Sequence, residues 1–141
     1  MKTDLLEIAL SQYGIKEVIG QVNNKKIVDY FKEIGHPEVK DDETAWCSAF
    51  VNWVAMKAGY HFTGKLNARS WLDIGTPTTT PEQGDVVILK RANDPQSGHV
   101  GFFINQDAYY IYMLGGNQGN QVNITPFHKD NLLGYRQLTK K

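Results

Sequence analysis

The sequence lacks most of the features that would place it in a specialised class of protein. It has one cysteine among 141 residues, so it forms no internal disulfide and neither requires nor excludes an oxidising compartment. Its fifteen basic and fifteen acidic residues cancel, and no long run of either sign gives the footprint of a nucleic-acid-binding protein. No apolar run is long enough to span a bilayer. We therefore expect a soluble protein with no nucleic-acid partner and no membrane insertion.

The first residues and the length of the chain add two further expectations, on export and on domain number. The first residues, Met1–Glu7, include acidic side chains where a signal peptide would need an apolar core, so we expect synthesis in the cytoplasm without an export signal. The length of the chain fits one domain with a real core, and we assign residues 1–141 to a single domain.

Patterns for metals and cofactors are also missing. The four histidines are scattered and the cysteine is single, so no pair has the spacing of a zinc site. The glycine-rich stretches match neither a phosphate loop nor a dinucleotide fingerprint. The acidic run Asp41–Glu43 offers oxygen ligands for an exposed calcium site, but such a cluster more often complements a helix N-terminus. We expect no metal and no cofactor.

The chain changes character half-way along. Its first half has the apolar spacing of helices at 4–13, 23–34 and 44–58, with a short helix at 67–74, and the run 76–81 is a connector. Its second half has β-rich segments at 85–90, 99–104, 109–114, 122–125 and 133–138. Helices followed by a strand meander predict an α+β fold with an antiparallel sheet of about five strands.

The only cysteine lies at the front of the third predicted helix. Apolar residues recur with helical spacing from Trp46 to Ala58, Thr44 suits the N-cap and Gly59 ends the helix, so Cys47 falls in the first turn. Unpaired backbone N–H groups and the helix dipole there favour a thiolate with a lowered pKa. Cys47 is thus a candidate nucleophile. The alternative is a small buried hydrophobe.

His99 is the histidine best placed to serve as a base. It opens a strand of otherwise apolar sequence, and it shares one face with Gly101, which leaves an opening beside it. If the following hairpin turns at Gln106–Asp107, His99 faces Leu114, and Asn117 is delivered beside the imidazole. An asparagine carbonyl there could orient the ring. The alternatives are a core histidine and an asparagine that serves only its turn.

Three segments together resemble a known superfamily: Trp46–Val51, Pro81–Asp85 and Gly98–Phe102. They look like the CHAP and NlpC/P60 superfamily of papain-like cysteine amidases and endopeptidases, which cut the peptide part of bacterial peptidoglycan. The likeness to a subgroup described as phage endolysins or CHAP-like hydrolases covers nearly the whole chain, through the segments Gly14–Glu17, Ala68–Trp71, Leu114–Gln118 and Gly134–Arg136.

The resemblance implies a papain-like fold and a Cys47–His99–Asn117 triad. Many CHAP domains carry a glutamate where this chain has Gly115, and a polar oxyanion donor where it has Trp46. The oxyanion donors would then be the Cys47 N–H and a further group, for which the segment 41–44 is a candidate.

Substrate contacts are expected from residues near the cysteine helix. The candidates are Trp46, Trp71, Asn67 and Arg69, with packing as the alternative for both tryptophans. Arg69 could pair with a carboxylate of the stem peptide.

The resemblance implies hydrolysis of an amide or peptide bond of the stem peptide, by an N-acetylmuramoyl-L-alanine amidase or an endopeptidase. Such an enzyme would act at the cell wall or periplasm as an endolysin or an antibacterial effector, with a holin, a secretion machine or an immunity protein as partner. The alternatives are a wall-binding module without catalysis and a cysteine-dependent acyltransferase or deamidase acting on protein.

Overall fold

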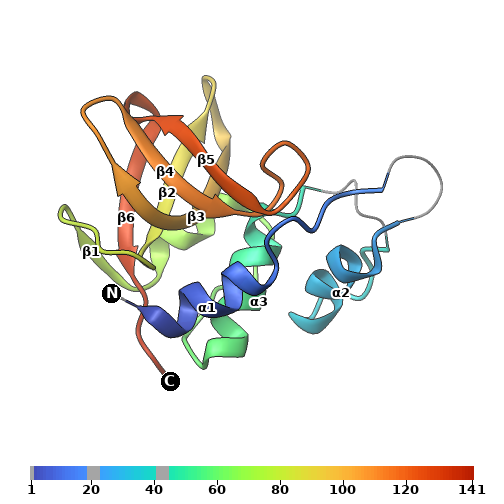
Figure 1. Cartoon of the computed structure of the whole chain (residues 1–141). Helices are drawn as coiled ribbons and strands as arrows, with labels where there is room; N and C mark the ends of the chain where they lie inside the picture. The colour runs from blue at the N-terminus through green and yellow to red at the C-terminus, as the bar shows by residue number, and fades with distance from the viewer. Residues whose placement is uncertain (1, 19–22, 41–44) are drawn as a thin grey trace.

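The computed structural model describes residues 2–18, 23–40 and 45–141. Within them, three α-helices precede the sheet (Figure 1): α1 (Thr3–Ser11), α2 (Lys25–Glu33) and α3 (Cys47–Ala58). Two 3-10 helices follow, η1 (Ala68–Asp73) and η2 (Lys129–Asn131). The strands are β1 (Thr76–Thr78), β2 (Val86–Arg91), β3 (Asp94–Gln106), β4 (Tyr110–Gly115), β5 (Asn123–His128) and β6 (Leu132–Gln137). This order confirms the predicted α+β class. None of the described helices is long and apolar enough to cross a membrane.

The described strands form one curved antiparallel sheet in the order β1-β6-β2-β3-β4-β5. The sequence predicted about five strands, and the additional one is β1, which was expected to be a connector. It pairs Thr76 with Gln137 at the edge of the sheet, where Pro77 is tolerated. Gly75 permits this approach, because a Cβ there would stand 2.5 Å from the carbonyl oxygen of Gln137.

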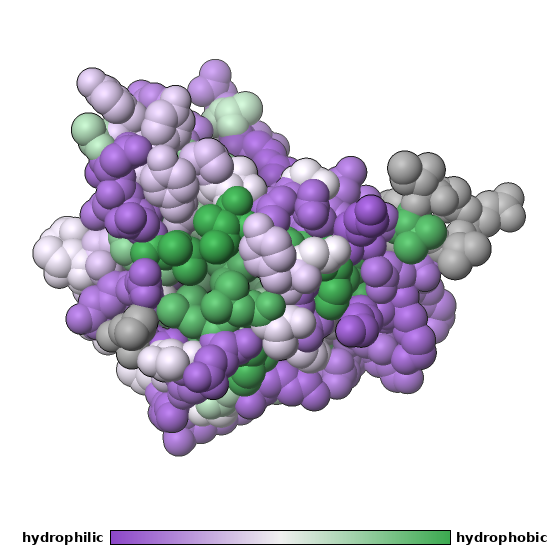
Figure 2. Space-filling view, in the orientation of Figure 1, coloured by the Kyte–Doolittle hydropathy of each residue, from purple (hydrophilic) through white to green (hydrophobic). Residues whose placement is uncertain are grey.

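Two apolar clusters lie on opposite faces of the sheet. On β2, Val86 and Ile88 belong to the larger cluster with the helices, whereas Val87 and Leu89 belong to the smaller one. This is the period-two alternation of a strand buried on both faces. Figure 2 shows hydrophobic residues gathered at the centre of the visible face, over the region where the strands lie next to α1.

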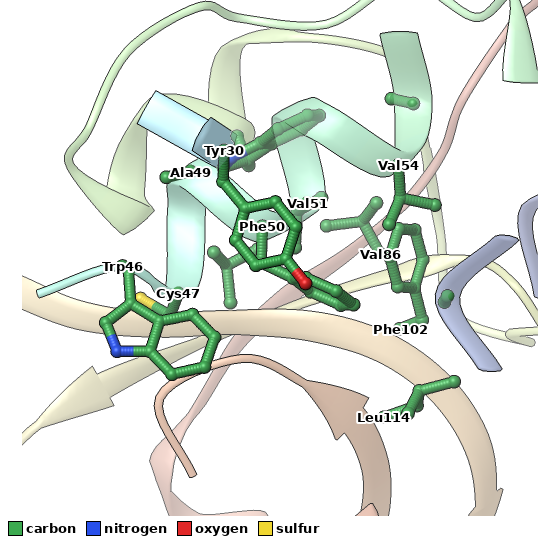
Figure 3. Packing of buried hydrophobic residues seen from close by; sticks show 14 of the residues in the cluster. Tyr30, Trp46, Cys47, Ala49, Phe50, Val51, Val54, Val86, Phe102 and Leu114 are labelled. Atoms are coloured by element: carbon green, nitrogen blue, oxygen red, sulfur yellow. The ribbon is translucent and has the colours of Figure 1, made fainter. Parts of the chain in front are cut away.

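The helix α3 is the centre of the larger cluster. It contacts α1, α2, β3 and β4, and it ends at Gly59, whose φ of 81° is left-handed. Aromatic rings pack around it (Figure 3), with Tyr30 of α2 edge-on to Phe50 at 5.5 Å between ring centroids. The N-terminal end of α3 is thereby fixed against the sheet, and this end carries Cys47.

Candidate active site

Cys47 is the first residue of α3, and it lies beside the strand that carries His99. Its thiol accepts a hydrogen bond from the backbone N–H of Val100, the residue after His99. Trp46 occupies the N-cap without a side-chain capping bond, and Thr44, the predicted N-cap, lies outside the described residues.

The thiol is buried, and its exposed fraction is 6%. Burial raises the pKa of Cys47, while the N–H of Val100 and the charge of Arg91 oppose this rise. The prediction of a lowered thiol pKa is therefore wrong for the free protein, because desolvation outweighs the helix N-terminus.

His99 lies on β3, on the face of the smaller cluster. It pairs with Leu89 of β2, and its ring stands 4.9 Å from that of Phe127 between centroids. Its exposed fraction is 3%, and this burial lowers its pKa to about 4, although the hydrogen bond from its side chain to Gln118 raises it. The imidazole is therefore neutral near pH 7.

The partner of the imidazole is Gln118. His99 Nε2 lies 2.9 Å from Gln118 Oε1, and Gln118 is itself buried. The carboxamide cannot be turned around, because its Nε2 donates to the carbonyl oxygens of Met113 at 3.1 Å and Asn123 at 2.8 Å. The oxygen must then face the ring, so the ring proton is on Nε2 and the lone pair is on Nδ1.

The Nδ1 atom is the part of His99 that is available to act as a base. It is buried, and it has no hydrogen-bond partner among the residues that the structure describes. A buried nitrogen with an unused lone pair can accept a proton without first breaking a hydrogen bond. Among the described residues, no hydrogen bond joins it to the Cys47 thiol, so Cys47 on α3 and His99 on β3 do not form a preformed pair.

Asn117, the predicted third member, does not hold the imidazole. Its backbone is left-handed, with a φ of 59°, and the hydrogen bond expected of it is made by the next residue. The expected hairpin register is also wrong: the turn lies between Gln106 and Ile111, a bulge interrupts the ladder between Phe103 and Asn105, and Leu114 pairs with Phe102 rather than with His99.

Gly115 makes room for Gln118. A Cβ on Gly115 would stand 2.5 Å from Gln118 Oε1, and one on Gly101 would stand 3.5 Å from it. The Gly101 distance is an ordinary contact, and a Cβ there would stand closer to Met113 Cε, at 3.0 Å, so the opening predicted beside His99 is filled by Met113 as well as by Gln118. The loop that carries Gln118 is also bonded to the segment after α1: the backbone N–H of Gly14 donates to the carbonyl oxygen of Val122.

A pocket of about 210 Å³ opens beside Cys47. It lies between the residues before α3, the start of η1 and the end of the β2–β3 hairpin. Its lining includes the predicted Asn67 and also Arg91, which the sequence analysis did not select; the other lining residues are Ala45, Leu66, Ala68, Gln96, Ser97 and Gly98. Among the described residues, this pocket gives a ligand access to the sulfur of Cys47.

A family model of the CHAP domain matches residues 39–117, which is more than half of the chain. The chain belongs to the CHAP family. The matched region contains Cys47 and His99 and ends at Asn117, so the CHAP match stops one residue before the glutamine that holds the imidazole.

Solved structures share the fold of this CHAP domain. An NlpC/P60 family protein from Bacillus cereus ATCC 10987 aligns with a TM-score of 0.60 and 14% identity over 97% of this chain and 40% of its own. A protein from Staphylococcus aureus subsp. aureus Mu50, described as similar to a lipoprotein of the NLP/P60 family, gives 0.58 and 18% over 99% and 41%. The chain thus spans about two fifths of the length of these structures. No curated protein matches the sequence.

Both tryptophans that were candidates for substrate contact are packing residues of the CHAP domain. Trp46 and Trp71 are completely buried, so neither side chain reaches a substrate. Trp46 donates its indole N–H to Glu17 at 2.8 Å, and Trp71 donates to Ser48 Oγ at 2.9 Å. Distant partners thus satisfy both polar atoms, which is what allows such large rings to be buried.

Arg69 is also used within the fold. Its Nε donates to the carbonyl oxygen of Ser97 at 2.8 Å and its Nη2 to that of Asp94 at 3.0 Å, which braces the β2–β3 hairpin. It lines a separate pocket on the far side of that hairpin. The arginine that lines the Cys47 pocket is Arg91.

Metal ligands do not gather among residues 2–18, 23–40 and 45–141, where no group of three or more His, Cys, Asp or Glu side chains could hold an ion. The acidic run Asp41–Glu43, considered for calcium, lies outside these residues.

Proposed function

We propose that residues 1–141 form a single catalytic domain that hydrolyses an amide or peptide bond in the stem peptide of bacterial peptidoglycan. In this proposal Cys47 is the nucleophile, His99 is the base and Gln118 orients the base. The observation that carries it is the fixed His99 tautomer, whose unused Nδ1 belongs to the residue adjacent to the one that contacts the Cys47 thiol. Membership of the CHAP family supports the substrate class.

The reaction begins from a neutral pair. As the sulfur of Cys47 attacks the carbonyl carbon, its proton passes to Nδ1 of His99, and the imidazolium that forms is stabilised through Nε2–H by Gln118 Oε1. The carbon–nitrogen bond then breaks, and the leaving amine takes the proton from His99. Water, deprotonated by the same ring, hydrolyses the thioester and restores the thiol.

The carbonyl oxygen becomes negative during attack and needs donors. The first N–H groups of α3 are suited to this role, because Trp46 places no side chain over them and the helix dipole adds a partial positive charge. The backbone N–H of Cys47 is therefore our proposed oxyanion donor. The segment 41–44, where we expected a second donor, lies outside the described residues.

Purified sacculi provide the direct test. The wild-type protein should release soluble fragments whose masses identify the bond that is cut, and Cys47→Ala and His99→Ala should release none. His61→Ala is the matched control, because His61 is exposed, follows the end of α3 opposite to Cys47 and does not line the pocket, and it should digest at the wild-type rate.

Other results would point to another function. Sacculus binding without cleavage, equal in wild type and Cys47→Ala, would replace the proposal with a wall-binding module. Fragments joined to an added amine or protein, in place of free carboxylates, would indicate acyl transfer.

The site of action belongs to the same proposal, as an endolysin or an antibacterial effector at the wall. Expression of the chain fused to an export signal should lyse a bacterial host, whereas expression in the cytoplasm should not. Equal toxicity in both compartments would contradict an action on the wall.

A further inference from the structure

Arg91 is the only charged residue among the described residues that line the Cys47 pocket. It is the last residue of β2 and its side chain is exposed. Its guanidinium makes no hydrogen bond and no ion pair with any residue of the described ranges, whereas Arg69 on the other side of the hairpin spends its N–H groups on two backbone carbonyls. The pocket therefore presents one positive charge that the fold itself does not use.

The backbone around Arg91 is held in place. The β2–β3 ladder shifts register between Lys90 and Arg91, where Arg91 pairs with Asp94, and Ser97 Oγ donates to the Arg91 carbonyl at 3.4 Å. Arg69 fixes the opposite strand of the same hairpin through Ser97 and Asp94. A braced hairpin end keeps Arg91 at the pocket while its long side chain stays free to meet a ligand.

The charge reaches the reacting groups. Arg91 lines the same pocket as Cys47, and its positive charge lowers the pKa of both Cys47 and His99. A ligand group that pairs with this guanidinium would therefore sit close to the bond under attack. The planar fork of a guanidinium matches a carboxylate in a two-point contact better than it matches a neutral amide.

We propose that Arg91 forms a carboxylate-binding subsite, so that the preferred substrate carries a free carboxylate next to the amide that Cys47 attacks. This inference rests on the proposed function for the identity of the substrate, a stem peptide. The recognition of an anion at the pocket, however, can be measured without any substrate.

Alkylation of the single cysteine measures the binding of an anion at the pocket without a substrate. Iodoacetate and iodoacetamide have nearly the same shape and differ in the carboxylate, so the ratio of their rates at Cys47 reports the charge of the pocket. Arg91→Gln should lower the iodoacetate-to-iodoacetamide ratio about fivefold, the scale of one exposed ion pair. Arg91→Lys should restore part of it. Lys90→Gln is the matched control: Lys90 is the exposed neighbour on β2 and lines the other pocket, and this variant should keep the wild-type ratio.

Cleavage of two matched muropeptides completes the test, one with a free carboxylate beside the scissile amide and one with the corresponding carboxamide. The wild type should favour the carboxylate, and Arg91→Gln should remove that preference while it still cuts the carboxamide. A rate ratio for the two reagents that is the same in wild type and Arg91→Gln would overturn the subsite even if sacculi are digested. An Arg91-dependent ratio without cleavage of either peptide would support the subsite and overturn the peptidoglycan function instead.

Discussion

The hydrogen bond between His99 and Gln118 gives the sharpest prediction, and Gln118→Met is the change that isolates it. Methionine is unbranched and similar in length, so it can occupy the space that Gly115 leaves for Gln118, but it lacks the amide oxygen that accepts from the imidazole. The bond is 2.9 Å long between two buried side chains, and it strengthens when His99 becomes charged during the reaction. A hydrogen bond to a charged group contributes about 1.5–3 kcal/mol. The expected loss in kcat/KM is therefore roughly tenfold to 150-fold.

The control for this change is the neighbouring residue. Asn117→Gly removes the side chain that the sequence pattern favoured and keeps the left-handed backbone at φ 59° without strain. It should cost less than about threefold, which is below the contribution of one neutral hydrogen bond. Digestion of sacculi under identical conditions measures both variants, and thermal unfolding confirms that each is folded.

A pH profile separates orientation of the base from a structural role of Gln118. His99 must be neutral to act as a base, so kcat/KM should fall as the pH drops through its pKa of about 4. The bond to Gln118 raises that pKa, and Gln118→Met should therefore move the acid limb to lower pH. Our reading would be refuted if Gln118→Met kept full activity, or if Asn117→Gly lost as much as Gln118→Met.

Two further predictions concern stability. Lys2→Ala should cost roughly 3 kcal/mol in urea unfolding, because it leaves the completely buried Asp85 carboxylate without its 2.7 Å partner. Loss of the exposed Lys25–Asp29 helix pair through Lys25→Ala should cost much less, and equal costs would contradict this account. Between pH 7 and pH 4, the free energy of unfolding should also fall by about 3 kcal/mol more in wild type than in His99→Gln. An equal fall in both proteins would refute the role of His99 in this loss of stability. The sign follows because the folded pKa of His99, about 4, lies below its ordinary 6.5, so its contribution is present above pH 6.5 and is lost as the pH falls toward 4.

Local patterns in the sequence were sufficient for the framework. The period of the apolar residues located α1, α2 and α3, and the change to alternation located β2 and the strands after it. Gly59 ends α3 as expected, with a left-handed φ of 81°. These elements are determined by neighbours along the chain, which is the information that a single sequence contains.

The errors arose where distant segments decide the outcome. The β3–β4 hairpin turns between Gln106 and Ile111, later than expected, and His99 lies beyond the paired residues. The imidazole is therefore met by the loop after β4, where Gln118 holds the ring and Asn117 is left-handed. Trp46 looked available for substrate until Glu17, 29 residues earlier, proved to hold its indole N–H. The sequence favoured Arg69 over Arg91 for a substrate contact, and only the packing of η1 on the β2–β3 hairpin shows that Arg69 is engaged by the backbone carbonyls of Ser97 and Asp94.

Access to the sulfur is the remaining constraint on the chemistry. Cys47 and His99 expose only 6% and 3% of their surfaces, so the proposed reaction requires a substrate carbonyl to enter through the pocket beside Asn67 and Arg91. Entry replaces water with substrate around two groups that burial already keeps neutral, so the charge separation of the reaction occurs after binding rather than before it. In the proposed mechanism, the N–H donors of α3 and the oxygen of Gln118 would then stabilise charges that do not exist in the free protein. A protein built in this way should react slowly with small alkylating agents in its free form and still cleave a substrate that fills the pocket, because its reactivity depends on occupancy and not on a preformed thiolate.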